Sequence, residues 1–308
     1  MRKYVVKAKL DIIFKKLFAD PKNEDILKAF ISDILDIPLQ DIKKIEITNP
    51  ELVPETVDEK FVRIDVKLTV NDSLVNIEIQ INNEGFFEDR SLYQWSRLFV
   101  SDLKRGQEYS ELKQCISINI INFNLFGCSA YHSSFSLRED TRYDRLTDKC
   151  AIHFFELKKI NKSKPNPEDR KELWMQLIDA ESEEEFDMLT KTNIEPIKKA
   201  VVAIKEMDAD EEIREKAFQR ETALRDRASA IRFSREEGIK EGIKEGLKEG
   251  RKEGIKEGLK EGRKEGIKET TIKLVKNLMK TMGLTAERAL SASGVPEEQW
   301  GEYLPQLV

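Results

Sequence analysis

The stretch RIDVKLTVNDSLVNIEIQ, residues 63–80, constrains the fold more tightly than any other part of the chain. Apolar and polar residues alternate on both sides of Asn71 and Asp72, as in two half-buried strands joined by a two-residue turn. Because successive side chains of a strand point to opposite faces, one face of this hairpin is apolar and the other is polar. The residues of the apolar face are Val62, Ile64, Val66, Leu68, Val70, Val75, Ile77, Ile79 and Ile81. The sequence therefore predicts an antiparallel strand pair with one face in a hydrophobic core.

Two carboxylates share the polar face of this hairpin. A two-residue turn pairs Val70 with Ser73, and counting outward along both strands sets Asp65 directly opposite Glu78. Directly opposed residues have Cβ atoms roughly 4.5–5.5 Å apart, and like charges at that spacing are destabilising unless a cation neutralises them. Mg²⁺ is a candidate because hard cations prefer carboxylate and carbonyl oxygens, and Gln80 follows on the same face. The alternative is a chance pair of acids that neighbouring basic side chains of the hairpin neutralise.

Composition narrows the classes of protein to which the chain can belong. The sequence is 36% charged, has no apolar run of membrane-spanning length and starts without a signal-peptide pattern, which predicts a cytoplasmic protein with no membrane partner. Cys115, Cys128 and Cys150 are widely spaced and odd in number, which argues against a disulfide framework or a zinc site. Neither His132 nor His153 lies near an evident nucleophile, so Ser-His or Cys-His catalysis has little support. The net charge of −5 disfavours a histone-like polyanion binder but is compatible with a local basic groove.

The order of elements predicts an α/β fold. Apolar residues recur at helical spacing in residues 10–20 and 23–35, and a strand is expected over 42–48 before the hairpin. A helix then follows the hairpin and ends at Gly106, and the stretches CISINIINFNLF and CAIHFFEL are expected strands. The resulting order of helices, three strands, helix and strand predicts an α/β sandwich domain over residues 1–160.

The helix after the hairpin carries two different lines of side chains. The line expected to be buried is Leu92, Trp95, Phe99 and Leu103. The line on nearly the opposite side is Arg90, Tyr93, Arg97 and Lys104. An arginine fork matches phosphate oxygens, so the second line is a candidate for tracking a phosphate backbone. An ordinary solvated helix face with a partly buried tyrosine is an equally good interpretation.

The C-terminal half differs in character from the domain before it. Residues 161–235 are predicted to form a helical connecting region, and residues 270–308 a small helical tail. Between them, residues 236–269 repeat a Gly-Xaa-Lys-Glu unit, with glycine at every fourth position from Gly238 to Gly266. Each glycine disfavours a helix by about 0.8–1 kcal/mol relative to alanine, so an isolated helix would be weak. A self-associating helical rod, which would wind right-handed because four exceeds 3.6, and a flexible charged spacer both fit the repeat.

Several motifs together resemble a known family. DIIFKKLF, IDVKLTVNDSLVNIEIQ, RSLYQWSRLF, GQEYSELKQCISINIINFNLF and the reiterated KEG tail resemble the Rpn family of recombination-promoting nucleases and transposases, a branch of the PD-(D/E)XK nuclease superfamily. The resemblance is close over residues 1 to about 160. It implies a restriction-endonuclease-like α/β core, with helix, three strands, helix and strand in that order, followed by a helical C-terminal extension. It also implies a metal-dependent DNA endonuclease that promotes recombination or transposition-like exchange.

The resemblance also implies roles for individual residues. Asp65 would be the motif aspartate, Glu78 and Gln80 would form the E-x-K element, and Asp11 would be an additional acid on the opening helix. Asp65, Glu78 and the carbonyl of Ile79 would hold Mg²⁺, or another divalent cation such as Mn²⁺ or Ca²⁺, and Gln80 would orient the attacking water. The chain departs from the general pattern because no proline precedes Asp65 and glutamine stands where lysine is usual, although relatives of this branch share the glutamine. A neutral amide cannot stabilise developing negative charge as a lysine would, so weak or conditional activity is expected.

The implied substrate is DNA. Arg90, Tyr93 and Arg97 would hold its backbone, and the C-terminal repeat would join copies of the chain into a homo-oligomer. The alternative is a non-catalytic assembly module, in which the core is a platform for DNA or protein and the repeat is an oligomerising rod.

Overall fold

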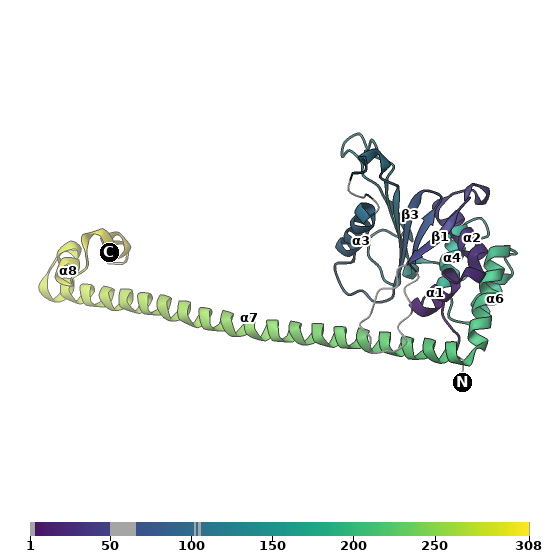
Figure 1. Ribbon diagram of the computed structural model, residues 1–308. Helices are drawn as coiled ribbons and strands as arrows, with labels where there is room; N and C mark the ends of the chain where they lie inside the picture. Colours follow the sequence, from purple (N-terminus) through teal and green to yellow (C-terminus); the bar gives the residue numbers. More distant parts are fainter. Residues whose placement is uncertain (1–3, 50–65, 102, 104–105, 308) are drawn as a thin grey trace. The chain divides into compact units, whose positions relative to one another are not determined.

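A six-stranded mixed β-sheet organises the first part of the chain (Figure 1). The computed structural model describes residues 4–49, 66–101, 103 and 106–307, and it divides into two units, residues 1–231 and 232–308. The strands are β1 Ile45–Asn49, β2 Val66–Val70, β3 Ser73–Gln80, β4 Cys115–Ile121, β5 His132–Phe135 and β6 Cys150–Glu156. Their order across the sheet is β1-β2-β3-β4-β6-β5, with β3, β4 and β6 parallel to one another and the other pairs antiparallel. The predicted α/β class is confirmed, and β5 is a strand that the sequence reading did not find.

The hairpin of β2 and β3 has the register that the sequence predicts. Val70 lies opposite Ser73, and the pairing continues as far as Val66 opposite Ile77. At the turn, Asn71 has φ +53°, a left-handed conformation that asparagine tolerates better than most residues. Its side chain accepts a hydrogen bond from the backbone of Lys43 at 2.9 Å, which ties the turn to the chain before β1. The hairpin geometry is thus fixed at its closed end, and Asp65 lies outside the described residues.

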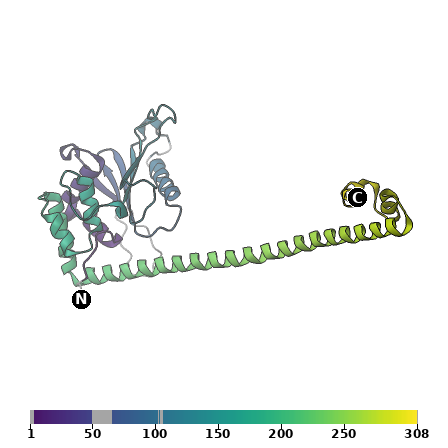
Figure 2. The ribbon, with the colours of Figure 1, turned by 180° about the vertical axis from the view of Figure 1, so that it is seen from behind.

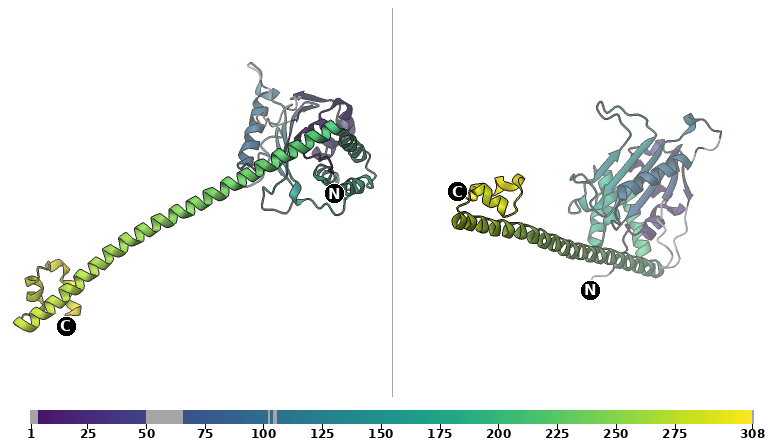
Figure 3. Two further views of the ribbon diagram at one scale, coloured as in Figure 1. Left: turned by 90° about the horizontal axis from the view of Figure 1, so that it is seen from below. Right: turned by 90° about the vertical axis from the view of Figure 1, so that its left-hand side faces the viewer.

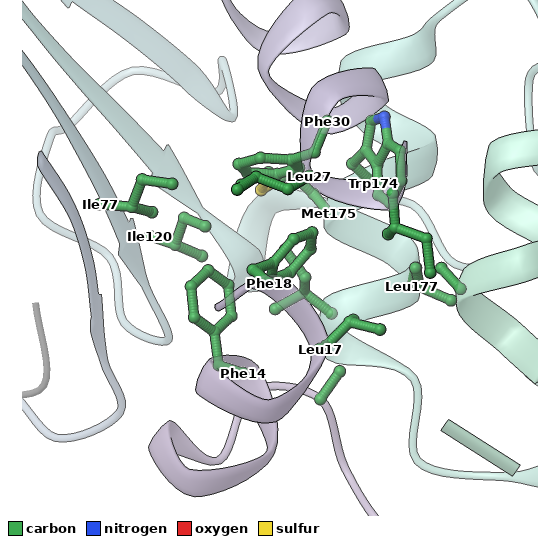
Figure 4. Close-up of a cluster of buried hydrophobic side chains, with 14 of the residues drawn as sticks. Phe14, Leu17, Phe18, Leu27, Phe30, Ile77, Ile120, Trp174, Met175 and Leu177 are labelled. Atoms are coloured by element: carbon green, nitrogen blue, oxygen red, sulfur yellow. The ribbon is translucent and has the colours of Figure 1, made fainter. Parts of the chain in front are cut away.

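Four helices gather on one face of the sheet, which we call the apolar face (Figures 1 and 2). They are α1 Asp11–Phe18, α2 Glu24–Leu35, α4 Arg170–Asp179 and α6 Glu195–Ala209, and α5 Glu183–Thr190 packs on α4 and α6. Ile77 of β3 and Ile120 of β4 point from the sheet toward Phe18 of α1 (Figure 4). The ring of Phe30 lies 4.6 Å from that of Phe18 and 5.4 Å from that of Trp174. This dense aromatic and aliphatic layer is the main core of the unit.

Helices α4, α5 and α6, which follow residue 161, belong to this same core. Trp174 of α4 is fully buried, and its indole N–H donates to Asp33 of α2 at 2.7 Å. Lys9, beside α1, forms a buried ion pair with Asp179 at the end of α4, with 2.7 Å between Nζ and Oδ1. The sequence predicts a domain boundary near residue 160, whereas the first unit of the structure continues to residue 231. Few apolar anchors are visible in this stretch of sequence, but Trp174 and Leu177 are both fully buried.

Helix α3, Phe87–Ser101, covers the other face of the sheet (Figure 1). Phe87, Ser91 and Trp95 face the strands, and the indole of Trp95 donates to the carbonyl of Cys115 at 2.9 Å. Leu92 is 55% exposed, so its assignment to the buried line was wrong. The helix is rotated so that residues four apart, starting from Phe87, meet the sheet. Leu103 is not helical, so the helix does not continue to Gly106.

The second unit contains most of helix α7, Glu211–Met282, which is one helix through the whole glycine repeat (Figure 3). The apolar residues of the repeat are 54–71% exposed: Ile239, Ile243, Leu247, Ile255, Leu259 and Ile267. After α7, helix α8, Ala286–Ala292, and two short 3-10 turns close a small core with the last turns of α7. The buried members of this core are Val275, Ala289, Leu290, Tyr303 and Leu307. Among the described helices of either unit, none is long and apolar enough to cross a membrane.

Candidate active site

Buried polar side chains lie on the sheet face beneath α3, which we call the polar face. In β3 they are Asn76 and Glu78, which are 3% and 2% exposed. In β4 they are Ser117 and Asn119, which are fully buried. The parallel register sets Asn76 beside Ser117 and Glu78 beside Asn119. Glu78, the carboxylate predicted from the sequence, is therefore buried among polar neighbours rather than exposed on a solvated hairpin.

The hydrogen bonds of this polar face are incomplete within the described residues. Asn119 Nδ2 donates to the carbonyl of His153 at 3.1 Å and to Ser117 Oγ at 3.3 Å. No donor among those residues reaches Oδ1 of Asn119 or Oδ1 of Asn76. A buried acceptor without a donor costs about 1–3 kcal/mol, so this arrangement is expensive for the fold. Such groups are retained where a ligand, water or ion uses them.

Glu78 pairs with an arginine of the covering helix. Arg90 Nη2 lies 3.3 Å from Glu78 Oε1, and the guanidinium lies 4.5 Å above the ring of Phe87. The Arg90 side chain is only 12% exposed, so it lies inward against the carboxylate. Tyr93 is 61% exposed, and the exposed Arg97 guanidinium lies 5.9 Å from its ring. The predicted phosphate-binding line is therefore split, with Arg90 at Glu78 and with Tyr93 and Arg97 on the outer surface, while Lys104 lies outside the described residues.

Gln80 ends strand β3 beside this carboxylate. Its side-chain amide nitrogen donates to the backbone carbonyl of Asn82 at 2.9 Å, and its backbone carbonyl accepts from the backbone N–H of Asn122 at 2.9 Å. These two bonds fix the end of the strand and the direction of the amide group. The Glu78 carboxylate, the Gln80 amide oxygen and backbone carbonyls are hard oxygen donors, which is the donor chemistry that Mg²⁺ and Mn²⁺ prefer. The donor set described here fits a divalent cation in chemical type.

Asp11, the fourth predicted site residue, is held by an arginine from far along the chain. Arg220 Nε donates to Asp11 Oδ1 at 2.8 Å, and Arg220 Nη2 pairs with Asp11 Oδ2. The backbone N–H of Ile12 also donates to Asp11 Oδ1 at 3.0 Å. Both oxygens of this carboxylate are thus used in anchoring the start of α7 to the start of α1.

The first turns of α7 also hold the segment that leaves the site. Arg220, Leu224 and Arg227 lie on one side of the helix because they are four and three residues apart. Asn82 Nδ2 donates to the carbonyl of Leu224 at 2.9 Å, and Arg227 Nε lies 2.9 Å from Glu84 Oε1. These residues were not among the predicted site residues. The only local signal was the spacing of the two arginines, which by itself identifies no partner.

The described residues do not complete a metal site. Within residues 4–49, 66–101, 103 and 106–307, no three His, Cys, Asp or Glu side chains gather as a group that could hold a metal ion. Asp65, which the sequence sets opposite Glu78, is not among them. The pairing of these two carboxylates is thus a prediction that the described structure neither supplies nor contradicts.

Comparison with protein-family models matches residues 8–234 to the PD-(D/E)XK nuclease family transposase model. The chain belongs to this family. The matched range ends close to residue 231, where the first unit ends. Neither the curated proteins nor the solved structures contain a significant match to the chain. The resemblance read from the sequence is confirmed, and so is the fold that it implies. Membership in the PD-(D/E)XK transposase family supports a nuclease-like function with DNA as the substrate class, and nucleases of this kind generally use divalent metal ions.

Proposed function

We propose that this PD-(D/E)XK family member is a divalent-metal-dependent endonuclease that hydrolyses DNA phosphodiester bonds. The observation that carries the proposal is the hairpin register, in which Val66 lies opposite Ile77. One more step of that register would set Asp65 opposite Glu78, which is buried on the polar face. Two carboxylates so close, in a buried polar layer, would need a cation between them.

Each predicted site residue has a role in this proposal. Asp65, Glu78 and the carbonyl of Ile79 would hold Mg²⁺, or Mn²⁺ or Ca²⁺ in its place. A bound divalent cation supplies Lewis acidity and lowers the pKa of a coordinated water. Gln80 would orient that water, because its amide is already fixed through the carbonyl of Asn82. Asp11 would be an additional acid of the site that contacts no metal and acts through its ion pair with Arg220.

The DNA backbone would contact the outer side of α3. Tyr93 and Arg97 are exposed there, and an arginine fork is well matched to phosphate oxygens. Arg90 would reach a phosphate only after leaving Glu78, its partner at 3.3 Å. We propose that the chain acts on DNA in the cytoplasm. The proposed outcome of cleavage is the promotion of recombination or of transposition-like exchange.

The test is nicking of supercoiled plasmid by the purified full chain with Mg²⁺ or Mn²⁺. Asp65→Ala and Glu78→Gln should each reduce nicking at least about a hundredfold, since each removes a charge that the transition state needs. Asp72→Asn, an exposed acid in the turn of the same hairpin, is the matched control and should nick like the wild type. Nicking that persists in Asp65→Ala, or in excess chelator, would contradict the proposal.

We also propose that the chain self-associates through residues 236–269. The apolar line of the repeat is exposed, and a Cβ added at any of the eight glycines from Gly238 to Gly266 would meet nothing within 4 Å. Alanine at four central glycines should therefore raise helicity in a single helix, by about 0.8–1 kcal/mol of helix propensity per site. If instead two backbones approach each other at glycine, the same alanines should dissociate the assembly.

Light scattering and circular dichroism over a concentration series separate these cases. Deleting residues 236–269 should reduce both oligomer size and helical content. A full-length monomer at every concentration, with equal helicity per residue after the deletion, would make the repeat a spacer only. An oligomer that cuts no DNA would support the alternative of a non-catalytic assembly module.

A further inference from the structure

Four side chains of alternating charge connect helix α7 to the candidate metal carboxylate. Arg227 Nε lies 2.9 Å from Glu84 Oε1, Glu84 Oε2 lies 4.0 Å from Arg90 Nη1, and Arg90 Nη2 lies 3.3 Å from Glu78 Oε1. The row begins on α7, passes through the loop after β3 and the first turn of α3, and ends inside the polar face. Its side chains are 36%, 29%, 12% and 2% exposed in this order, so solvent screening weakens steadily toward Glu78.

Arg90 therefore has two carboxylates within reach, one in the candidate site and one outside it. In this arrangement its guanidinium is closer to Glu78, where a divalent cation would compete for the same oxygens. A cation at Glu78 would repel the guanidinium, and Glu84 is the nearest described carboxylate that can receive it. Arg227, by pairing with Glu84, reduces the negative charge that draws Arg90 outward.

We infer that Glu84 and Arg227 are positioning residues that set how strongly Arg90 competes with a divalent cation for Glu78. This inference rests on the proposed function, because it needs a cation that binds Glu78. Glu84 favours cation binding by accepting Arg90, and Arg227 opposes it by occupying Glu84. The foot of α7 thereby adjusts the metal affinity of a site to which it contributes no ligand.

The two substitutions are expected to act in opposite directions. Glu84→Gln leaves Arg90 with Glu78 as its remaining partner in the row, so Mn²⁺ should bind about twofold to fivefold more weakly, as expected for losing one partly exposed ion pair. Arg227→Gln frees Glu84 to attract Arg90, so Mn²⁺ should bind about twofold to threefold more tightly. Damage to the fold would weaken binding in both variants.

The measurement is Mn²⁺ binding to the purified full chain without DNA, by electron paramagnetic resonance of the free ion at fixed salt and pH. Glu88→Gln, in the first turn of α3, and Arg225→Gln, two residues before Arg227 on α7, make the same changes of charge outside the row. They measure the general effect of charge on binding. The inference requires that Glu84→Gln and Arg227→Gln exceed these controls.

The deciding measurement repeats both substitutions in a chain that also carries Arg90→Met. Without the guanidinium, Glu84→Gln and Arg227→Gln should shift the Mn²⁺ dissociation constant no more than their controls do. Equal shifts with and without Arg90, or shifts in one direction for both variants, would overturn the inference while leaving the nuclease proposal standing. A wild-type chain that binds no Mn²⁺, or a Glu78→Gln variant that binds it as tightly as the wild type, would overturn both.

Discussion

The two faces of the central sheet are both buried, but in the described part of the chain only the polar face combines an apolar cluster, around Trp95 and Phe154, with buried polar side chains. On the apolar face, Ile77 and Ile120 pack against aromatic rings of α1, α2 and α4. On the polar face, Asn76, Glu78 and Asn119 lie beneath one helix, α3, with amide oxygens that find no donor among the described residues. Ile77 and Asn76 are neighbours in one strand, but their side chains lie on opposite faces of the sheet, one among hydrocarbon and one among polar groups.

The apolar face contributes mainly to the stability of the fold, and the polar face carries the residues of the candidate site. The apolar face removes hydrocarbon from water at about 25 cal/mol per Å² and so supplies most of the free energy of folding. The polar face retains a buried carboxylate and unsatisfied amides, which cost stability. A chain selected only for stability would fill that layer with apolar side chains, so the polar residues there point to binding or catalysis. Four predictions test this contrast.

The largest expected effect is on the apolar face. Ile77→Asn would bury an amide at a fully buried position among hydrocarbon and should lower the free energy of unfolding by about 3–5 kcal/mol. Urea denaturation followed by circular dichroism measures this change. A loss below about 1 kcal/mol would show that this face tolerates polar groups, which would remove the contrast.

The second prediction concerns the only two histidines, at the edge of the sheet beside Phe155. His132 Nε2 lies 3.1 Å from His153 Nδ1, and burial, with the neighbouring His132, lowers the pKa of His153 from 6.5 to about 4. Between pH 6.5 and 4, His153 is protonated in the unfolded chain but stays neutral in the folded chain. The free energy of unfolding therefore falls as the pH drops from 6.5 to 4. His153 alone should account for a loss of about 3 kcal/mol over this range.

Urea denaturation from pH 7.5 to 4 checks the second prediction. Because carboxylates also titrate there, the informative quantity is the difference between the wild type and His153→Asn, which cannot take up the proton. The variant should show a shallower fall in stability. Parallel curves for the two proteins would contradict a neutral, buried His153.

The third prediction compares the outer side of α3 with the side that lies on the polar face. Arg97→Ala should weaken DNA binding about fivefold to tenfold across sequences and reduce the salt dependence by about one unit, as for one lost phosphate contact. Arg90 is paired with Glu78, so Arg90→Ala should change the salt dependence less. Fluorescence anisotropy with labelled duplexes at several salt concentrations measures both. Equal slopes for the wild type and Arg97→Ala would make the outer line an ordinary solvated helix face.

The smallest expected effect is on the polar face itself. Asn76→Leu replaces an amide whose oxygen has no described donor by an apolar side chain of similar size, and should raise the free energy of unfolding by up to about 1 kcal/mol. Metal binding or cleavage should weaken in the same variant if the amide serves the site. A large loss of stability would show instead that Asn76 is a structural residue.

The hairpin was predictable because its signal is local. The alternation around Asn71 and Asp72 determines both the register and the side of the sheet on which Glu78 lies, through the two-residue period of a strand. Glycine spacing likewise identified the repeat. The role of α3 was predicted only in part, because Arg90 and Leu92 lie near the boundary between its buried and exposed sides. A small rotation of the helix decides which of them faces the sheet, and the sequence does not specify that rotation.

By itself, then, the sequence determined the strand pair, the order of the elements before β5, the family and the face of the sheet on which Glu78 lies, since all of these follow from short-range patterns or shared motifs. The tertiary structure alone decided that Arg90 pairs with Glu78, that Arg220 holds Asp11, and that Arg227 reaches Glu84. Arg220 and Asp11 are 209 residues apart in the chain, and no local propensity encodes such a pair. It forms because α6 packs on α1, α2 and α4, and this packing directs the first turns of α7 past the start of α1 and the segment after β3.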